Sequence, residues 1–134
     1  MVATRGINHP GLSVKRLEET RDFFIELLGW TESGHDPEYP RTAVSDGTAR
    51  LTLWQVDHRR DIVDFDMRSN VGLHHLALEV DSDKALEELA ERLGAAPGVD
   101  LEFTPELMGD GPRRHFICRE PGGLRIEFTW PGPR

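Results

Sequence analysis

The 134-residue sequence has one cysteine, Cys118, and therefore lacks a partner with which it could form an internal disulfide. A single cysteine is typical of proteins of the reducing cytosol, so we expect a cytoplasmic protein. The first ten residues lack the apolar core of a secretory signal, which agrees with that expectation. No run of residues approaches the roughly 18 consecutive apolar residues of a transmembrane helix, so we expect no membrane span.

The sequence also lacks any long run of basic residues. Its 24 acidic residues outnumber its 16 lysines and arginines, which gives a formal net charge of -8. A surface of this charge repels phosphate backbones, so nucleic acid is not an expected partner. The hydrophobic fraction of 37% and the charged fraction of 30% are typical of globular proteins. We therefore expect one domain, residues 1–134, with a hydrophobic core.

An internal repeat aligns residues 9–14 with residues 75–80. The two segments, HPGLSV and HLALEV, each begin with a histidine and have apolar residues at the fourth and sixth positions. Both are predicted to be short strands, because they are rich in leucine and valine. The repeat therefore predicts that His9 and His75 occupy equivalent places in two halves of the chain.

An amphipathic helix is predicted after each of these two strands. Apolar residues recur at helical spacing in both halves; they are Leu17, Phe23, Phe24, Leu27 and Leu28, and then Leu86, Leu89, Ala90 and Leu93. Ser82 or Asp83 is expected to cap the start of the second helix. Gly29 and Gly94 follow the last apolar residues, where a left-handed end of a helix favours glycine.

The alignment continues to the end of each half, where residues 45–54 match residues 120–129. Each of these segments has turn residues followed by an alternating strand, as in a hairpin. Further strands are expected near Thr42–Val44, His115–Arg119, Leu101–Phe103 and Thr31–Gly34. Residues 57–70 and 104–112 are predicted to be connectors, the second a loop rich in glycine and proline. The sequence thus predicts an α+β fold of two pseudo-symmetric βαβββ modules, residues 5–56 and 71–131.

Three side chains from distant parts of the sequence are candidate metal ligands. Glu127 lies between Ile126 and Phe128, and alternation along a strand directs it away from the helix side of the sheet. His9 and His75, at the start of matched strands, are expected on the same side. Two imidazoles and one carboxylate are a common donor set for Fe(II), Mn(II), Ni(II) or Zn(II).

The position that matches Glu127 in the first half is Thr52, whose neutral hydroxyl is a poor metal donor. The sequence therefore favours a site with three protein ligands over a closed site with four. Three ligands leave positions open for water or substrate, as in catalytic metal sites.

The segments NHPGLSV, FFIELLGW, HHLALEV and EPGGLRIEF together resemble the vicinal oxygen chelate superfamily. That superfamily includes glyoxalase I, methylmalonyl-CoA epimerase, extradiol dioxygenases, and the fosfomycin and bleomycin resistance proteins. The resemblance covers nearly the whole chain and implies that the modules form a half-barrel cavity around a divalent metal ion. It implies His9, His75 and Glu127 as the metal ligands, a small-molecule substrate, and a homodimer whose site lies within one chain or between two.

The resemblance leaves three functions open. The leading hypothesis is a metal-dependent lyase or isomerase, like glyoxalase or the epimerases, acting on a small oxygenated metabolite. Those enzymes usually have Glu or Gln where this chain has Thr52, and Gln55 has the wrong strand parity to replace it. An Fe(II)-dependent extradiol-type dioxygenase matches the three ligands but usually has Tyr at the position of Ile117. A drug-binding protein like the bleomycin resistance proteins would usually lack the metal triad.

Two further residues are candidates because they share the strand face of Ile117. His115 is predicted to act as a general acid or base, since an imidazole exchanges protons near neutral pH. Arg119 is predicted to bind an anionic group of the substrate. His74, next to His75, is expected to face the opposite way and to have a packing or surface role.

Overall fold

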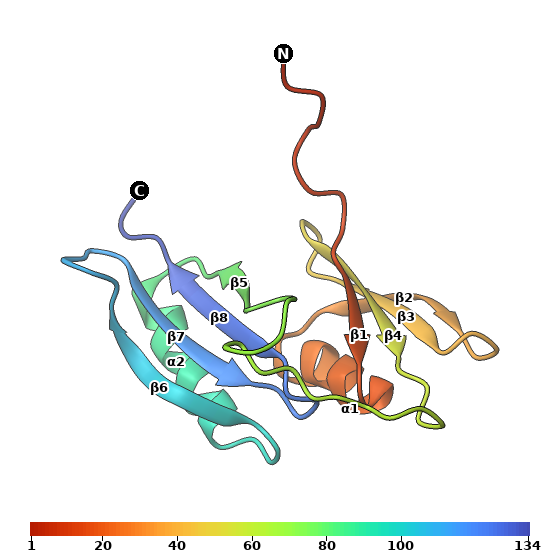
Figure 1. Cartoon of the computed structure of the whole chain (residues 1–134). Coiled ribbons are helices and arrows are strands. Elements are labelled where there is room, and N and C mark those ends of the chain that lie inside the picture. Colours follow the sequence, from red (N-terminus) through yellow and green to blue (C-terminus); the bar gives the residue numbers. More distant parts are fainter. The chain divides into compact units, whose positions relative to one another are not determined.

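A computed structural model describes all residues, 1–134, and divides them into two compact units. Unit 1 is Met1–Ile62 and unit 2 is Val63–Arg134 (Figure 1). The predicted modules, residues 5–56 and 71–131, lie within these two units. That the whole chain forms a single domain, with one half-barrel cavity, stays a prediction.

Unit 1 is a four-stranded sheet with one helical segment. Its elements are β1 (Gly11–Val14), α1 (Leu17–Asp22), the π-helical turn η1 (Phe23–Leu27), β2 (Thr31–Asp36), β3 (Arg41–Ser45) and β4 (Arg50–Gln55). The strand order is β1-β4-β3-β2, in which β1 and β4 are parallel and the other pairs are antiparallel.

Unit 2 repeats this topology. Its elements are β5 (Leu76–Glu79), α2 (Asp83–Gly94), β6 (Asp100–Leu107), β7 (Arg114–Arg119) and β8 (Arg125–Trp130). The order is β5-β8-β7-β6, again with the first pair parallel and the others antiparallel. Figure 1 shows α2 lying across one face of this sheet, where it contacts β6, β7 and β8. The predicted α+β class and the βαβββ order of each half are confirmed.

Strand register confirms the alignment of the two halves. Gly11 pairs with Thr52 on the parallel neighbour β4, and Ala77 pairs with Glu127 on β8. Gly11 and Ala77 each lie two residues after the histidine of their repeat. Thr52 is therefore the structural equivalent of Glu127, as the sequence alignment predicts.

The helix of unit 1 widens where it buries its aromatic residues. The Leu28 N–H donates to the carbonyl of Phe23, five residues back, and the turn holds Phe23 and Phe24 in the core. Phe24 also packs against Trp30, with ring centroids 5.0 Å apart. Gly29 has a φ of 75°, so it ends this segment in the predicted left-handed conformation.

In unit 2, Ser82 is the residue that caps α2, because its side chain accepts from the Ala85 N–H at 3.0 Å. The prediction for Gly94 was wrong: the helix includes Gly94, and the Ala95 N–H continues it by donating to the carbonyl of Glu91. The left-handed glycine lies further along, at Gly98, with a φ of 80°.

The expected loop at 104–112 was too long. β6 extends to Leu107, because Glu106 and Leu107 pair with His115 and Arg114 of β7. This extension brings Glu106 beside His115, which bears on the site described below. None of the helices in the chain is both long enough and apolar enough to cross a membrane.

Cys118 is buried in the sheet of unit 2, and this burial, with the nearby Glu120 and Glu102 carboxylates, raises the pKa of its thiol from 9.0 to about 12. The thiol therefore contributes stability that is fully present below its unfolded pKa and is lost as pH rises toward 12.

A shift of three pKa units leaves roughly a thousandfold less Cys118 thiolate in the native protein near pH 8. We expect native protein to react with iodoacetamide at least that much more slowly than urea-unfolded protein, as measured by mass spectrometry. Equal labelling rates would contradict this burial.

Candidate functional site

Glu127 lies on the face of the unit 2 sheet that is opposite to α2. Its neighbours Ile126 and Phe128 are buried on the other face, where the Phe128 ring stacks on Phe116 at 5.0 Å. Ile117 pairs directly with Glu127, so the two side chains share a face. The predicted orientation of Glu127 thus agrees with the pairing of β7 and β8.

His75 and Glu127 lie together in unit 2. His75 Nε2 is 3.4 Å from Glu127 Oε2, and Glu127 is 6% exposed. The other carboxylate oxygen, Oε1, accepts a hydrogen bond from the Thr129 hydroxyl at 2.7 Å. That bond fixes the rotation of the carboxylate and leaves Oε2 directed at the imidazole. Two of the three predicted ligands therefore meet within one unit.

His115 lies on the other side of the same carboxylate. Its Nδ1 is 3.7 Å from Glu127 Oε1, and its Nε2 is 3.9 Å from Glu106 Oε1. The ring of Phe103 packs against it at 5.1 Å. Nδ1 is buried without a hydrogen-bond partner, an unusual state for a polar atom in a folded protein. A buried polar atom in this state requires an explanation, such as a catalytic role or a bound water or ion.

His9 belongs to unit 1 and precedes β1. Its Nδ1 is 2.7 Å from the side-chain oxygen of Asn8. The equivalent of Glu127, Thr52, has its hydroxyl engaged by the indole N–H of Trp54 at 3.0 Å. Within the units, no group of three or more His, Cys, Asp or Glu side chains is arranged to hold a metal ion.

A cluster of charged residues, of which the sequence indicated only Arg119, lies on the same sheet face as Glu127. Arg125 donates two hydrogen bonds to Glu102, at 2.7 and 2.9 Å, and this contact holds the pKa of the Glu102 carboxyl below its ordinary value. Arg119, the predicted anion-binding residue, donates only its Nε–H to Glu102, at 3.3 Å. Arg119 also lines a cavity of about 250 Å³, together with Arg68 and Arg125.

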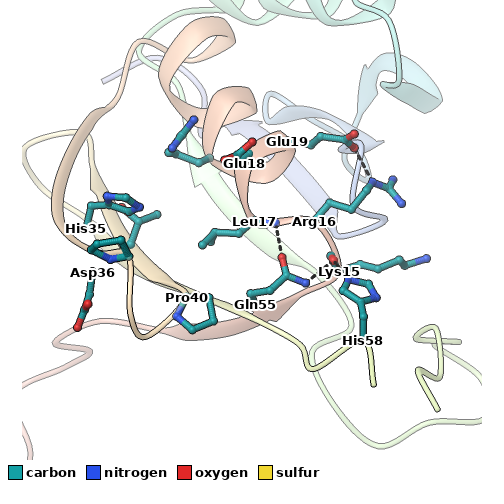
Figure 2. Close-up of a pocket in the computed structure, with 13 residues that line it drawn as sticks. Lys15, Arg16, Leu17, Glu18, Glu19, His35, Asp36, Pro40, Gln55 and His58 are labelled. Atoms are coloured by element: carbon teal, nitrogen blue, oxygen red, sulfur yellow. Dashed lines mark hydrogen bonds and ion pairs between the residues drawn. The ribbon is translucent and has the colours of Figure 1, made fainter. Parts of the chain in front are cut away.

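A larger cavity of about 560 Å³ lies in unit 1, and its lining includes none of the predicted site residues (Figure 2). Gln55 on β4 reaches into it, accepts from the Leu17 N–H at 2.8 Å and donates to the Lys15 carbonyl at 2.6 Å. His58 Nε2 lies 2.7 Å from the same carbonyl. Figure 2 shows Gln55 joining the start of the helix to the sheet, so its amide has a structural role. This contact also explains why Gln55 cannot replace Thr52.

The two units share one topology, and each has a histidine before its first strand, so they define a protein of paired βαβββ modules. Residues 6–128 match the family described as the Glyoxalase/Bleomycin resistance protein/Dioxygenase superfamily. The chain belongs to this superfamily, which confirms the resemblance inferred from the sequence.

Three similar proteins illustrate this membership. A 2-epi-5-epi-valiolone epimerase from Actinomyces sp is 28% identical over 155 residues, which cover 91% of this chain and 77% of that protein. A glyoxylase/bleomycin resistance protein/dioxygenase domain from Frankia sp. EAN1pec has a TM-score of 0.80 at 23% identity and covers 96% of this chain and 99% of its own. A lactoylglutathione lyase from Agrobacterium tumefaciens has a TM-score of 0.71 at 18% identity, covering 96% of both chains. The two solved structures show that the fold is shared.

Proposed function

We propose that the chain is a metal-dependent lyase or isomerase that acts on a small oxygenated metabolite, with His9, His75 and Glu127 as metal ligands. One observation carries the proposal. His75 Nε2 and Glu127 Oε2 face each other at 3.4 Å without a hydrogen bond between them. Both atoms are metal-ligand types, and a carboxylate oxygen can only accept. A cation between them would be bound by the carboxylate and by the lone pair of an Nε2 atom that carries no proton.

The third ligand in this proposal is His9, supplied by unit 1 of the same chain or of a second copy. Its Nδ1 contacts the Asn8 side chain, which leaves Nε2 as the ligand atom. Because the Thr52 hydroxyl accepts from Trp54, a fourth side chain is missing and the donor set is an open one. When bound, a divalent cation would act as a Lewis acid that stabilises negative charge on a substrate oxygen.

His115 is proposed to move the proton. Its unpartnered Nδ1 lies toward Glu127, whereas its Nε2 lies toward Glu106, whose side chain is exposed. One nitrogen can thus take a proton from a substrate carbon while the other exchanges with solvent. Ile117, which pairs with Glu127, has no proton to give, so this face has no equivalent of the dioxygenase tyrosine.

Arg119 is proposed to bind an anionic group of the substrate at the edge of the same sheet face. Glu102 occupies only its Nε–H, so the two terminal nitrogens remain available for a bidentate contact. The relative named as an epimerase supports isomerase chemistry, because removal and return of a proton at carbon is one way to invert a stereocentre.

The first test is metal binding to protein purified without added metal and titrated with Fe(II), Mn(II), Ni(II) or Zn(II). We expect the wild type to bind one of these ions, and His75→Gln to bind it at least roughly 100-fold more weakly. His58→Gln is a matched control, because His58 is exposed and lies in the unit 1 cavity. Equal binding by wild type and His75→Gln would overturn the assignment of the site.

The second test separates catalysis from binding. The metal-loaded chain is incubated with 2-epi-5-epi-valiolone in D2O, and solvent deuterium at carbon is followed by NMR. We expect incorporation by the wild type and its loss in His115→Gln with metal binding retained. Tight binding of the compound without incorporation would favour a binding protein, and oxygen uptake with Fe(II) would favour a dioxygenase.

A further inference from the structure

We infer that a chain of hydrogen bonds from Glu102 through Arg125 to His74 fixes His75 as the tautomer protonated on Nδ1. His75 then presents the lone pair of Nε2 to Glu127. The importance of this lone pair rests on the proposed function, but the tautomer is a property of the protein alone. His74 and Arg125 are positioning residues in this account.

The first step is the contact of Arg125 with His74. Arg125 is 9% exposed and is held by its two hydrogen bonds to Glu102. Its Nη1 donates to the His74 carbonyl at 3.0 Å and lies 3.1 Å from His74 Nδ1. A guanidinium has donors only, so a proton on His74 Nδ1 would face another N–H and a positive charge. His74 Nδ1 is therefore the bare nitrogen.

The second step is the contact between the two imidazoles. Nδ1 of His74 lies 2.8 Å from Nδ1 of His75, a distance that requires one proton between them. Since Arg125 disfavours that proton on His74, His75 carries it and donates it. A neutral imidazole protonated on Nδ1 has its lone pair on Nε2, which is the atom 3.4 Å from Glu127 Oε2.

In unit 1, too, the residue before the histidine places a side-chain acceptor beside Nδ1 of that histidine. Asn8 precedes His9 as His74 precedes His75, and its side-chain oxygen is 2.7 Å from His9 Nδ1. An amide oxygen only accepts, so His9 is also protonated on Nδ1 and bare on Nε2. The two units thus use different side chains at equivalent positions for one purpose. A chance contact would not be expected to recur at the matched place.

This arrangement has a direct consequence for metal affinity. An imidazole that donates its second N–H to a fixed acceptor is held in the ligating tautomer and orientation. Loss of such an acceptor typically weakens metal binding by roughly 10- to 100-fold. His74→Leu should show this loss, because leucine cannot accept. His74→Asn should retain much of the affinity, because it reproduces the acceptor that unit 1 uses at Asn8.

The direct test is the tautomer of His75 in the metal-free full chain, labelled with 15N-histidine at about pH 8, where a histidine is ordinarily neutral. Long-range 1H–15N spectra distinguish protonated from bare ring nitrogens, and His75→Gln assigns the signals. We expect Nδ1–H on His75 in wild type and in His74→Asn, and a mixture or Nε2–H in His74→Leu. Nε2–H in the wild type, or an unchanged tautomer in His74→Leu, would overturn the inference.

Zn(II) titration of the same proteins separates this inference from the proposed function. An Nδ1–H tautomer that depends on His74, in a protein that binds no metal at His75, supports the inference and overturns the proposed metal site. Metal binding at His75 that is equal in wild type and His74→Leu supports the site and overturns the positioning role. Both ideas hold if His74→Leu loses the tautomer and binds Zn(II) at least roughly 10-fold more weakly while His74→Asn does not.

Discussion

Replacing Glu127 by glutamine should remove metal binding while leaving the stability of the metal-free protein nearly unchanged. Glutamine keeps the size of the side chain and an oxygen that can accept from Thr129, but it loses the charge that attracts a cation. We expect the affinity for the preferred divalent ion to fall by at least roughly 100-fold. Because glutamine keeps the hydrogen bond from Thr129 and loses only the longer contacts to His75 and His115, at 3.4 and 3.7 Å, the unfolding free energy should stay within about 1 kcal/mol of the wild-type value.

Elemental analysis measures the predicted loss of bound metal. Urea unfolding of the metal-free protein measures the predicted free energy of unfolding. Glu79→Gln is the matched control, because Glu79 lies exposed on the neighbouring strand β5 and its carboxylate pairs with Arg134. That control should bind metal as the wild type does. Equal metal in Glu127→Gln would remove Glu127 from the site. A large loss of stability in the same variant would instead assign it a structural role.

Much of the fold was predictable because one repeat supplied two independent copies of each pattern. The matched positions of His9 and His75 made Thr52 the counterpart of Glu127, and the pairing of Gly11 with Thr52 and of Ala77 with Glu127 confirms this. Alternation within one strand needs only local sequence, so the orientation of Glu127 followed directly. Helix ends were less predictable, as at Gly94, because a few backbone hydrogen bonds decide them.

The orientation of His74 illustrates where local patterns fail. Alternation would direct His74 away from His75, but the strand begins only at Leu76, so neither histidine is bound by strand geometry. Their Nδ1 atoms approach to 2.8 Å instead. The prediction of opposite directions was therefore wrong, whereas the predicted surface position of His74 agrees with its exposure.

The pair Glu102 and Arg125 could not have been found from spacing alone. The two residues lie on β6 and β8, with β7 between them. Only long side chains on the same face can reach across an intervening strand, and the sequence does not state the strand order. A weaker signal was present, since Arg125 is two residues before Glu127 and therefore shares its face. The contact between Glu102 and Arg125 thus depends on the order of the strands in the folded sheet.

Phe128→Ala should have the opposite effect to Glu127→Gln, although the two positions are neighbours. Phe128 is 2% exposed, and its ring stacks on Phe116 with an interplanar angle of 26°. Removing a buried phenylalanine side chain typically costs about 3–5 kcal/mol, because lost burial adds to the cavity left behind. We expect that loss in urea unfolding of the full chain, and a loss of less than about half that size in Phe128→Leu.

Phe128 and Glu127 point to opposite faces of β8, so the loss of core packing at Phe128 is expected to leave metal binding at Glu127 intact. Phe128 packs on the helix side of the sheet, so its removal should not displace Glu127 or Thr129 on the other side. At a temperature where Phe128→Ala remains folded by circular dichroism, its metal affinity should stay within roughly 3-fold of wild type, because local core collapse moves the opposite face little. A 10-fold weaker affinity in a folded Phe128→Ala protein would show that packing under the sheet sets the position of the carboxylate. The metal site would then depend on the core as well as on the hydrogen bond from Thr129.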